Sequence, residues 1–445
     1  MSKCKQIKMG ALGTFTRGRG GPKSDEEVNG IPCVRYGDIY TKHGAIIRKF
    51  SSSISPQRLS DYTTIRFGDI VFAASGETFE EIGKATVFLG NEIACVGGDT
   101  IVFKPNAEVL DSVFCAYAMG ADDAIRHRSK MGQGSSVIHI SGQHIASYEI
   151  PLPPLPQQRR IAEILSTVDD AIEATETLIA KQQQIKQGLM HDLFTRGVWT
   201  AESIARAQHA GSKFAATSAK PGQLRPPRET APELYQESPL GWIPKDWEVK
   251  ELGTMSEIVS GVTLNASSDS GVRIVPYLRV ANVQDGYLDL SEVKTVCVSE
   301  AQFVKLQLRQ GDVLMNEGGD FDKLGRGTVW NCEVEPCVHQ NHVFRVRPKA
   351  EQLDSHYLAF WSQSHFGKKY FVLNSKQSTN LASINSTQLN KFPVFCSSLA
   401  EQQEIVRLIG SVVEKVGALT AETAKLQKQK QGLMQDLLSG EVQVS

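Results

Sequence analysis

One phrase occurs twice in this chain of 445 residues, and it limits the folds that the chain can adopt. Lys186–Phe194 reads KQGLMHDLF and Lys430–Leu438 reads KQGLMQDLL, so seven of the nine letters agree. Measured between Gly188 and Gly432, the two copies stand 244 residues apart. Two unrelated amphipathic helices would agree in this way only by coincidence. A tandem duplication would repeat the same separation elsewhere in the chain.

The separation of 244 residues does recur. The matching segments are IPCVRYGDI at 31–39 with VPYLRVANV at 275–283, Phe67–Phe88 with Gln310–Trp330 after one residue of slippage, and HISGQHI at 139–145 with SINSTQL at 383–389. Within them, GDI and GDV each read as a turn that enters a buried strand, followed by a glycine-rich loop. We therefore expect an α+β fold with a pseudo-twofold internal repeat. The expected globular domains are residues 1–153 and 242–396.

The segments that follow these domains, 154–197 and 397–440, carry small or apolar residues at alternating spacings of four and three. This spacing is typical of a helix that packs along a partner helix. With one leucine from each repeated phrase, the expected seam is Ile161, Leu165, Val168, Ile172, Ile179, Leu189, Ile405, Ile409, Val412, Val416, Leu419, Leu426 and Leu433. The pattern predicts two long antiparallel helices that form a coiled-coil spacer. Because Gln182, Lys186 and Lys430 interrupt the seam, partner proteins are also expected to dock on it.

Both helices have recognisable ends. Ser398 and Glu401 fit an S-x-x-E capping box, and Pro156 lies where the first helical turn tolerates proline. Gly197 and Gly440 are the expected stop signals.

Residues 198–241 are expected to form a flexible linker. The stretch KPGQLRPPRETAP at 220–232 has few large apolar groups, so it has little surface to bury. Trp242 and Trp247 follow the linker and are expected to pack in the core of the second domain.

Composition excludes several classes of protein. The first residues lack the apolar stretch of a signal peptide, and no run of about eighteen apolar residues could span a membrane. The eight cysteines are scattered, as in a chain with reduced thiols. We therefore expect a cytoplasmic protein. Residues 1–60 contain about eleven Lys and Arg against about four Asp and Glu, so the start of the chain is basic.

No motif for catalysis or for a bound cofactor is convincing. GETFEEIGKAT at 76–86 lacks the glycine spacing and the Ser/Thr of a phosphate-binding loop. Cys332, Cys337, His339 and His342 lie close together, but their spacing does not fit a zinc finger. No Ser-His-Asp set stands out. We expect neither a metal site nor a cofactor bound by this chain.

Three motifs together resemble the specificity subunit of type I restriction-modification systems. They are PLPPLPQQRRIAEIL at 151–165, the KQGLM-x-DLL phrase at the end of both helices, and GWIPKDWEVKELG at 241–253. The resemblance covers nearly the whole chain. One departure is that the first domain opens with CKQIKMGALGTF and lacks the tryptophan-containing entry of the second domain.

The resemblance implies that the chain is a non-catalytic subunit with two target recognition domains. Each domain would read one half-site of a bipartite target in double-stranded DNA, and the helices would set the unspecified gap. Two methylation subunits would dock on the helices and supply S-adenosylmethionine chemistry on adenine. Two restriction subunits, which use ATP and Mg²⁺, would complete the complex.

Candidate DNA-binding residues are polar or cationic side chains on expected loops, because such groups hydrogen-bond base edges and phosphates. In the first domain they are Arg17, Arg19, Lys23, Ser75, Lys84, Gln133, Ser135, Ser136 and His139. In the second they are Asn316, Lys323, Arg326, His339, Gln340, Asn341, Lys376, Gln377 and Asn380. Lys84 and Arg326 occupy equivalent places and are candidates for a shared phosphate contact.

Three alternatives stay open. The chain could be a coiled-coil scaffold without a DNA role, or the specificity subunit of a system that only methylates. A self-contained methylase or nuclease would need cofactor motifs that the sequence does not contain.

Overall fold

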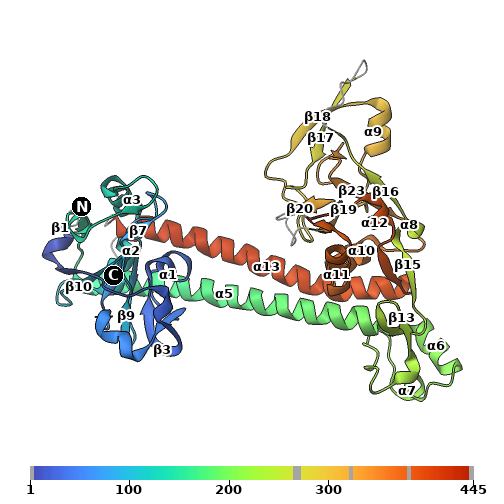
Figure 1. The fold of residues 1–445 in the computed structure, drawn as a ribbon, viewed down its shortest axis with the longest axis horizontal. Helices are drawn as coiled ribbons and strands as arrows, with labels where there is room; N and C mark the ends of the chain where they lie inside the picture. Colours follow the sequence, from blue (N-terminus) through green and yellow to red (C-terminus); the bar gives the residue numbers. More distant parts are fainter. Residues whose placement is uncertain (1–4, 264–271, 320–323, 378–381, 440–445) are drawn as a thin grey trace. The chain divides into compact units, whose positions relative to one another are not determined.

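The computed structural model describes residues 5–263, 272–319, 324–377 and 382–439. The chain forms two compact units, one made of residues 1–178 with 419–445 and the other of residues 179–418 (Figure 1). Each unit contains one globular domain and parts of both long helices. Among the described residues, no helix has the length and apolar character needed to cross a membrane.

The first domain is built on two four-stranded sheets. One has the order β2 (Gly13–Arg17), β10 (Thr100–Pro105), β6 (Ile70–Ala73), β8 (Ala85–Val87); the other has the order β4 (Ser52–Ile54), β3 (Glu26–Val34), β9 (Ala94–Val96), β5 (Thr63–Ile65). Two short pairs add β1 (Gln6–Lys8) with β12 (Glu149–Pro151), and β7 (Ser75–Gly76) with β11 (Ile138–His139). The helices are α1 (Tyr36–Thr41), α2 (Ser112–Ala118), α3 (Asp122–Met131) and α4 (Gly142–Ala146).

The second domain repeats this topology, except that among its described residues the second sheet and the small sheet each have three strands. Its main sheet has the order β16 (Ser256–Ser260), β23 (Val343–Pro348), β19 (Val313–Asn316), β21 (Gly327–Val329), and a second sheet has the order β18 (Lys294–Ser299), β17 (Val272–Leu278), β22 (Val338–His339). β15 (Glu248–Glu251) pairs with β26 (Pro393–Cys396), and β25 (Ala382–Ser383) pairs with β20 (Gly318–Gly319) and β24 (Lys376–Gln377). The helices are α8 (Leu252–Met255), α9 (Glu300–Leu306), α10 (Ser355–Gln363), α11 (His365–Asn374) and α12 (Ser386–Asn390). The structure confirms the α+β fold and the internal repeat.

The GD turns show how one local sequence makes the same structure twice. Gly68 and Gly311 have φ values of 86° and 85°, a region that favours glycine. The following aspartates accept backbone hydrogen bonds, Asp69 from Arg66 at 2.9 Å and Asp312 from Arg309 at 2.7 Å. Each turn leads directly into a fully buried strand, β6 or β19.

The two long helices are α5 (Leu155–Arg196, 42 residues) and α13 (Leu399–Leu438, 40 residues). A buried glutamine near each start ties the helix to the domain before it. Gln158 Oε1 accepts from the Asp111 N–H at 2.8 Å, and Gln402 Oε1 accepts from the Asp354 N–H at 2.9 Å. Both amide nitrogens donate to two backbone carbonyl oxygens each. Because each glutamine satisfies three partly buried backbone groups, replacing it would remove a hydrogen-bond partner from all three.

Within each unit, α5 and α13 run antiparallel. In the first unit, Ile161 and Leu165 share a hydrophobic cluster with Leu437 and Leu438. In the second, Met190 and Phe194 share one with Ile405 and Ile409. None of the thirteen predicted seam residues is exposed, and the four nearest the helix starts, Ile161, Leu165, Ile405 and Ile409, are fully buried.

The cations on the seam have partners inside their own unit. The Lys430 amine lies 2.6 Å from Asp169 Oδ1 and 5.6 Å from the centre of the Tyr117 ring. The Lys186 amine donates to Gln363 Oε1 at 3.2 Å and lies over the Phe360 ring. Lys430 is therefore ion-paired where it interrupts the apolar stripe, and Lys186 is held there by a hydrogen bond and a ring contact.

The helix ends follow the sequence only in part. Gly197 ends α5 with a φ of 64°, as its place after the helix predicts. The Glu401 N–H donates to Ser398 Oγ at 3.3 Å, which is one half of the expected capping box. The Glu401 carboxylate does not close the box. It accepts hydrogen bonds from the Val198 N–H, from Trp247 Nε1 and from the Arg225 guanidinium. The other expected stop, Gly440, lies outside the described residues.

The expected flexible linker is instead folded. It contains α6 (Ala201–His209), α7 (Lys213–Thr217) and the hairpin of β13 (Tyr235–Ser238) with β14 (Gly241–Pro244). Trp199, Ala215, Ala231, Leu234 and Tyr235 form a small core of their own. The prediction failed because Arg225, whose side chain is 2% exposed, pairs with Glu401, which is distant in sequence and 1% exposed.

The two tryptophans after the linker differ. Trp247 is fully buried, as expected, whereas Trp242 is 45% exposed and lies under the Arg228 guanidinium at 4.6 Å.

Candidate nucleic-acid interface

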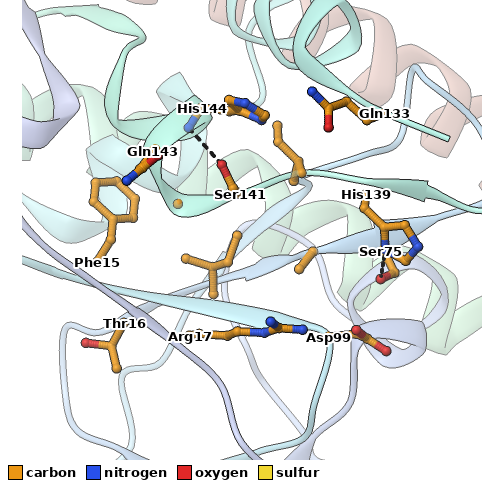
Figure 2. A pocket seen from close by; sticks show the side chains of 14 residues that line it. Phe15, Thr16, Arg17, Ser75, Asp99, Gln133, His139, Ser141, Gln143 and His144 are labelled. Carbon is orange, nitrogen blue, oxygen red and sulfur yellow. Dashed lines mark hydrogen bonds between the residues drawn. The ribbon is translucent and has the colours of Figure 1, made fainter.

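A cleft of about 430 Å³ opens in the first domain between β2, the start of β10, the β7–β11 pair and α4 (Figure 2). Phe15, Ile101 and Ile140 supply its apolar walls. Phe15 is fixed by packing against the Phe103 ring, with ring centres 4.5 Å apart. Two of these walls, Phe15 and Ile101, therefore belong to the main sheet, on β2 and β10.

The edge of the cleft is polar and open to solvent. Arg17, Asp99, Gln133 and His139 line it, and all four side chains are exposed. In Figure 2, Arg17 extends along the cleft toward Asp99, while Gln133 and His139 lie on the opposite side. An open, polar edge over an apolar floor can form hydrogen bonds to a large ligand that lies across it.

His139 is held in place by its neighbours. β7 and β11 place it opposite Ser75, and the Ser75 hydroxyl and His139 Nδ1 are hydrogen-bonded at 2.8 Å. Ser75 is buried, and its carbonyl oxygen accepts from the Tyr40 hydroxyl at 2.9 Å. On the other side, two backbone hydrogen bonds join His139 to Gln133, at 2.9 and 2.7 Å. The ring is thus presented at the edge of the cleft in a defined orientation.

A serine hydrogen-bonded to a histidine also occurs in hydrolases. In a catalytic triad a carboxylate orients the histidine through its other nitrogen. Among the described residues, no hydrogen bond reaches Nε2 of His139. The Ser75 hydroxyl is buried beneath the ring. This geometry suits a positioned hydrogen-bonding group better than a nucleophile and its base.

The cleft brings together four of the predicted DNA-binding residues: Arg17, Ser75, Gln133 and His139. Arg19, Lys23, Ser135 and Ser136 are exposed but do not line it. Lys84 is half-buried, its amine donates to the Tyr40 carbonyl oxygen at 3.3 Å, and burial lowers its pKa.

The cleft also includes residues that the sequence did not indicate, such as Thr16, Asp99, Gln143 and His144. Gln143 and His144 belong to the repeated HISGQHI segment, so the duplication was the only sequence signal for them.

In the second domain, two of the predicted DNA-binding residues are buried, so these two predictions are wrong. Asn316 is fully buried, and its amide donates to the Val283 carbonyl oxygen at 2.9 Å. His339 is fully buried, and its Nδ1–H donates to the Val343 carbonyl oxygen at 2.6 Å. Both residues stabilise the domain from within and do not reach its surface.

The other candidates of the second domain lie in several places. Gln340 and Asn341 are half-buried, and their N–H groups bond to Leu278 and Val262. Arg326 is half-buried and donates to Gln284 Oε1 at 2.8 Å. Like Lys84, it contacts its own domain, which argues against a shared phosphate contact. Lys376 is exposed on β24, and Gln377 pairs through its backbone with Ala382. Lys323 and Asn380 lie outside the described residues.

His339 makes the second domain sensitive to acid. Burial lowers the pKa of His339 to about 4. The hydrogen bond to the Val343 carbonyl oxygen acts in the opposite direction, because it favours the protonated ring. The unfolded chain, with a histidine pKa near 6.5, binds more protons below neutral pH, so stability falls as pH falls from about 6.5 to 4. Between pH 7 and pH 5 we expect a loss of about 2 kcal/mol in the free energy of unfolding.

Urea unfolding at the two pH values measures this loss. His339→Gln should remove most of it, because glutamine does not titrate. His342→Gln, at an exposed site three residues away, should retain it. An equal loss with and without His339 would contradict the assignment.

In the part of the chain that the structure describes, no three His, Cys, Asp or Glu side chains gather as a metal site. Cys337 and His339 are both buried, whereas His342 is exposed and bonds through Nδ1 to Glu317 Oε2 at 2.6 Å. The side chains of Cys337, His339 and His342 therefore do not share one environment.

Comparison with known proteins identifies the family. Residues 1–186 and 244–428 match the model for the type I restriction modification DNA specificity domain. The chain is 24% identical over 363 residues to the type I restriction enzyme MjaVIII specificity subunit of Methanocaldococcus jannaschii, a match that covers 80% of this chain and 76% of that protein. It is 25% identical over 210 residues to the putative MjaX specificity subunit of the same organism, and there it spans only about half of the relative, 49%.

The fold is similar to a solved structure as well. The crystal structure of the type I restriction-modification S subunit from M. genitalium superposes with a TM-score of 0.56 at 14% identity, covering 98% of this chain and 96% of that chain. The family match accounts for both copies of the repeat. The chain therefore belongs to the family of type I restriction-modification DNA specificity subunits.

Proposed function

We propose that this chain is the sequence-reading subunit of a type I restriction-modification complex and binds a bipartite target in double-stranded DNA. Each globular domain reads one half-site, and the long helices set the length of the gap. The observation that carries the proposal is the repeat itself: two domains share one topology, and the first has an open polar cleft at its surface. A duplicated reader accounts for a target made of two short blocks.

In this proposal the chain has no catalytic role. Partner methylation subunits, two per complex, supply S-adenosylmethionine chemistry, and two restriction subunits supply ATP- and Mg²⁺-dependent activity, all in the cytoplasm. The long helices are the proposed docking surface for the methylation subunits. Leu178 and Ile185 on α5 are 47% and 44% exposed, so apolar surface is left on the helix for a partner.

Methylome sequencing tests the proposal. Cells carry this gene with the gene for its methylation subunit, and a strain without this gene is the control. We expect a methylated adenine motif of two short blocks separated by a fixed gap, which disappears on deletion. If the methylation subunit is active and no bipartite motif depends on this gene, a scaffold role is favoured instead. Methylation without any restriction of unmodified DNA would identify a system that only methylates.

A further inference from the structure

Strand pairing identifies which residues occupy the same place in the two domains. In the first domain, β11 puts His139 opposite Ser75, and Gln133 bridges to His139. In the second domain, β25 puts Ser383 opposite Gly318, and Lys376 pairs with Ser383. By this pairing Lys376 takes the place of Gln133, and Ser383 that of His139. The separation of 244 residues also matches His139 with Ser383, but it matches Gln133 with Gln377, the neighbour of Lys376 on β24. The equivalence rests on backbone register, so it does not depend on any likeness between the side chains.

These positions combine a shared backbone with different chemistry. Gln133, His139, Lys376 and Ser383 are all exposed. The first domain presents an amide and an imidazole, whereas the second presents an ammonium group and a hydroxyl. Because all four side chains are exposed and carry hydrogen-bonding groups, they are available to a polar ligand.

We propose that this cross-strand pair is the base-reading element of each domain: Gln133 with His139 reads bases of one half-site, and Lys376 with Ser383 reads bases of the other. The inference rests on the proposed function and assigns that function to particular residues. Its ligands are the base edges in the major groove of double-stranded DNA.

The chemistry of the side chains suits this ligand. A glutamine amide can donate to N7 and accept from N6 of adenine, or bond other edges singly, and lysine donates to N7 and O6 of guanine. Ser75 occupies Nδ1 of His139, which leaves Nε2 as the atom available to a base. Serine at 383 can donate or accept, so it adapts to several bases.

The separation of the two side chains in each pair also suits base edges as the ligand. Residues directly opposite on antiparallel strands place their Cβ atoms about 5 Å apart on one face. Neighbouring base pairs are stacked about 3.4 Å apart. Two side chains of this length can therefore reach adjacent base pairs, and the backbone hydrogen bonds between Gln133 and His139 keep their separation constant.

Exchanging the pairs between domains tests the proposal in the complete complex. The full-length chain carrying Gln133→Lys with His139→Ser is expressed with its methylation subunit, and the methylome is sequenced. We expect one block of the motif to change, with preference at the affected base pairs altered by about 5- to 150-fold, while the other block and the gap stay the same. Gln6→Lys is the matched control, because it adds the same charge on β1, outside the cleft, and should leave the motif unchanged.

The reciprocal variant, Lys376→Gln with Ser383→His, should change the other block only. If both double variants methylate the original motif at the original level, these positions do not read bases and the inference is wrong. If methylation is lost, the purified complex is offered DNA with a randomised block. Selection of a new block supports the inference, and failure to select any block at an unchanged melting temperature overturns it.

The two double variants check each other. If one of them lowers the melting temperature, the motif that is methylated with the variant in the other domain tests the inference. Failure of the proposed function has a different signature, because the unsubstituted chain would then direct no bipartite motif at all.

Discussion

Replacing Glu401 by glutamine is expected to lower the free energy of unfolding of the full-length chain by about 3 kcal/mol, the lower end of the range for breaking a buried ion pair. Its carboxylate is buried and receives hydrogen bonds from Arg225 at 3.1 Å, from Trp247 Nε1 at 3.0 Å and from the Val198 N–H at 2.9 Å. The Arg225 guanidinium would remain buried with Asp246 as its only carboxylate partner among the described residues, at 2.9 Å. That remaining partner is why we expect the lower end.

Urea unfolding followed by tryptophan fluorescence measures this effect, because the Trp199 and Trp247 rings lie 5.1 and 6.0 Å from the Arg225 guanidinium carbon. Glu404→Gln is the matched control. It removes a carboxylate of the same helix that pairs with exposed Arg407, and it should cost less than about 1 kcal/mol. The double variant Arg225→Met with Glu401→Leu should be more stable than Glu401→Gln. A Glu401→Gln variant as stable as the control would show that the ion pair does not anchor the segment.

Removing residues 433–445 is expected to unfold the first domain, although the deletion is at the opposite end of the chain. Leu437 and Leu438 are buried in the same cluster as Phe103 and Leu165, and Leu433 and Met434 pack against it. Replacing Leu438 alone by alanine should cost about 2–5 kcal/mol, so losing the whole segment exceeds the stability of a typical domain core.

Hydrogen exchange shows which domain the truncation unfolds. Amides of β10 in the first domain should lose protection in the truncated chain, while those of β23 in the second domain should keep it. Gln435→Ala, at an exposed position of the same helical turn, should leave both unchanged. Equal protection of β10 in the truncated and full-length chains would contradict the role given to these leucines.

The parts of the fold that the sequence predicted have local causes. The 4,3 spacing is a property of a single helix, and the constant separation of 244 residues can be read without knowing any contact. The GD turns are also local, because each needs only a glycine that accepts positive φ and an aspartate that caps the turn.

The sequence-based predictions that were wrong failed because of contacts between residues far apart in the chain. Glu401 has the right spacing for a capping box. Its carboxylate instead pairs with Arg225, a buried arginine far away in sequence. Asn316 and His339 have the side chains of base readers, yet β19 and β22 place both in the interior. For the cleft, the sequence could indicate Gln133 and His139 separately. That Ser75 orients His139 depends on pairing between β7 and β11, which no local pattern encodes.

The paired glutamines at the helix starts have a consequence for how such chains diversify. The Gln158 side chain hydrogen-bonds to Val109, Asp111 and Pro153, and the Gln402 side chain makes the matching set with Gln352, Asp354 and Ser397. Each anchor therefore joins a globular domain to the helix that directly follows it in the gene. A crossover inside the helix would transfer a domain together with its own attachment. If each domain reads one half-site, as proposed, recombination between relatives would in this way exchange one half of the recognised sequence while the anchor of the other half stays intact.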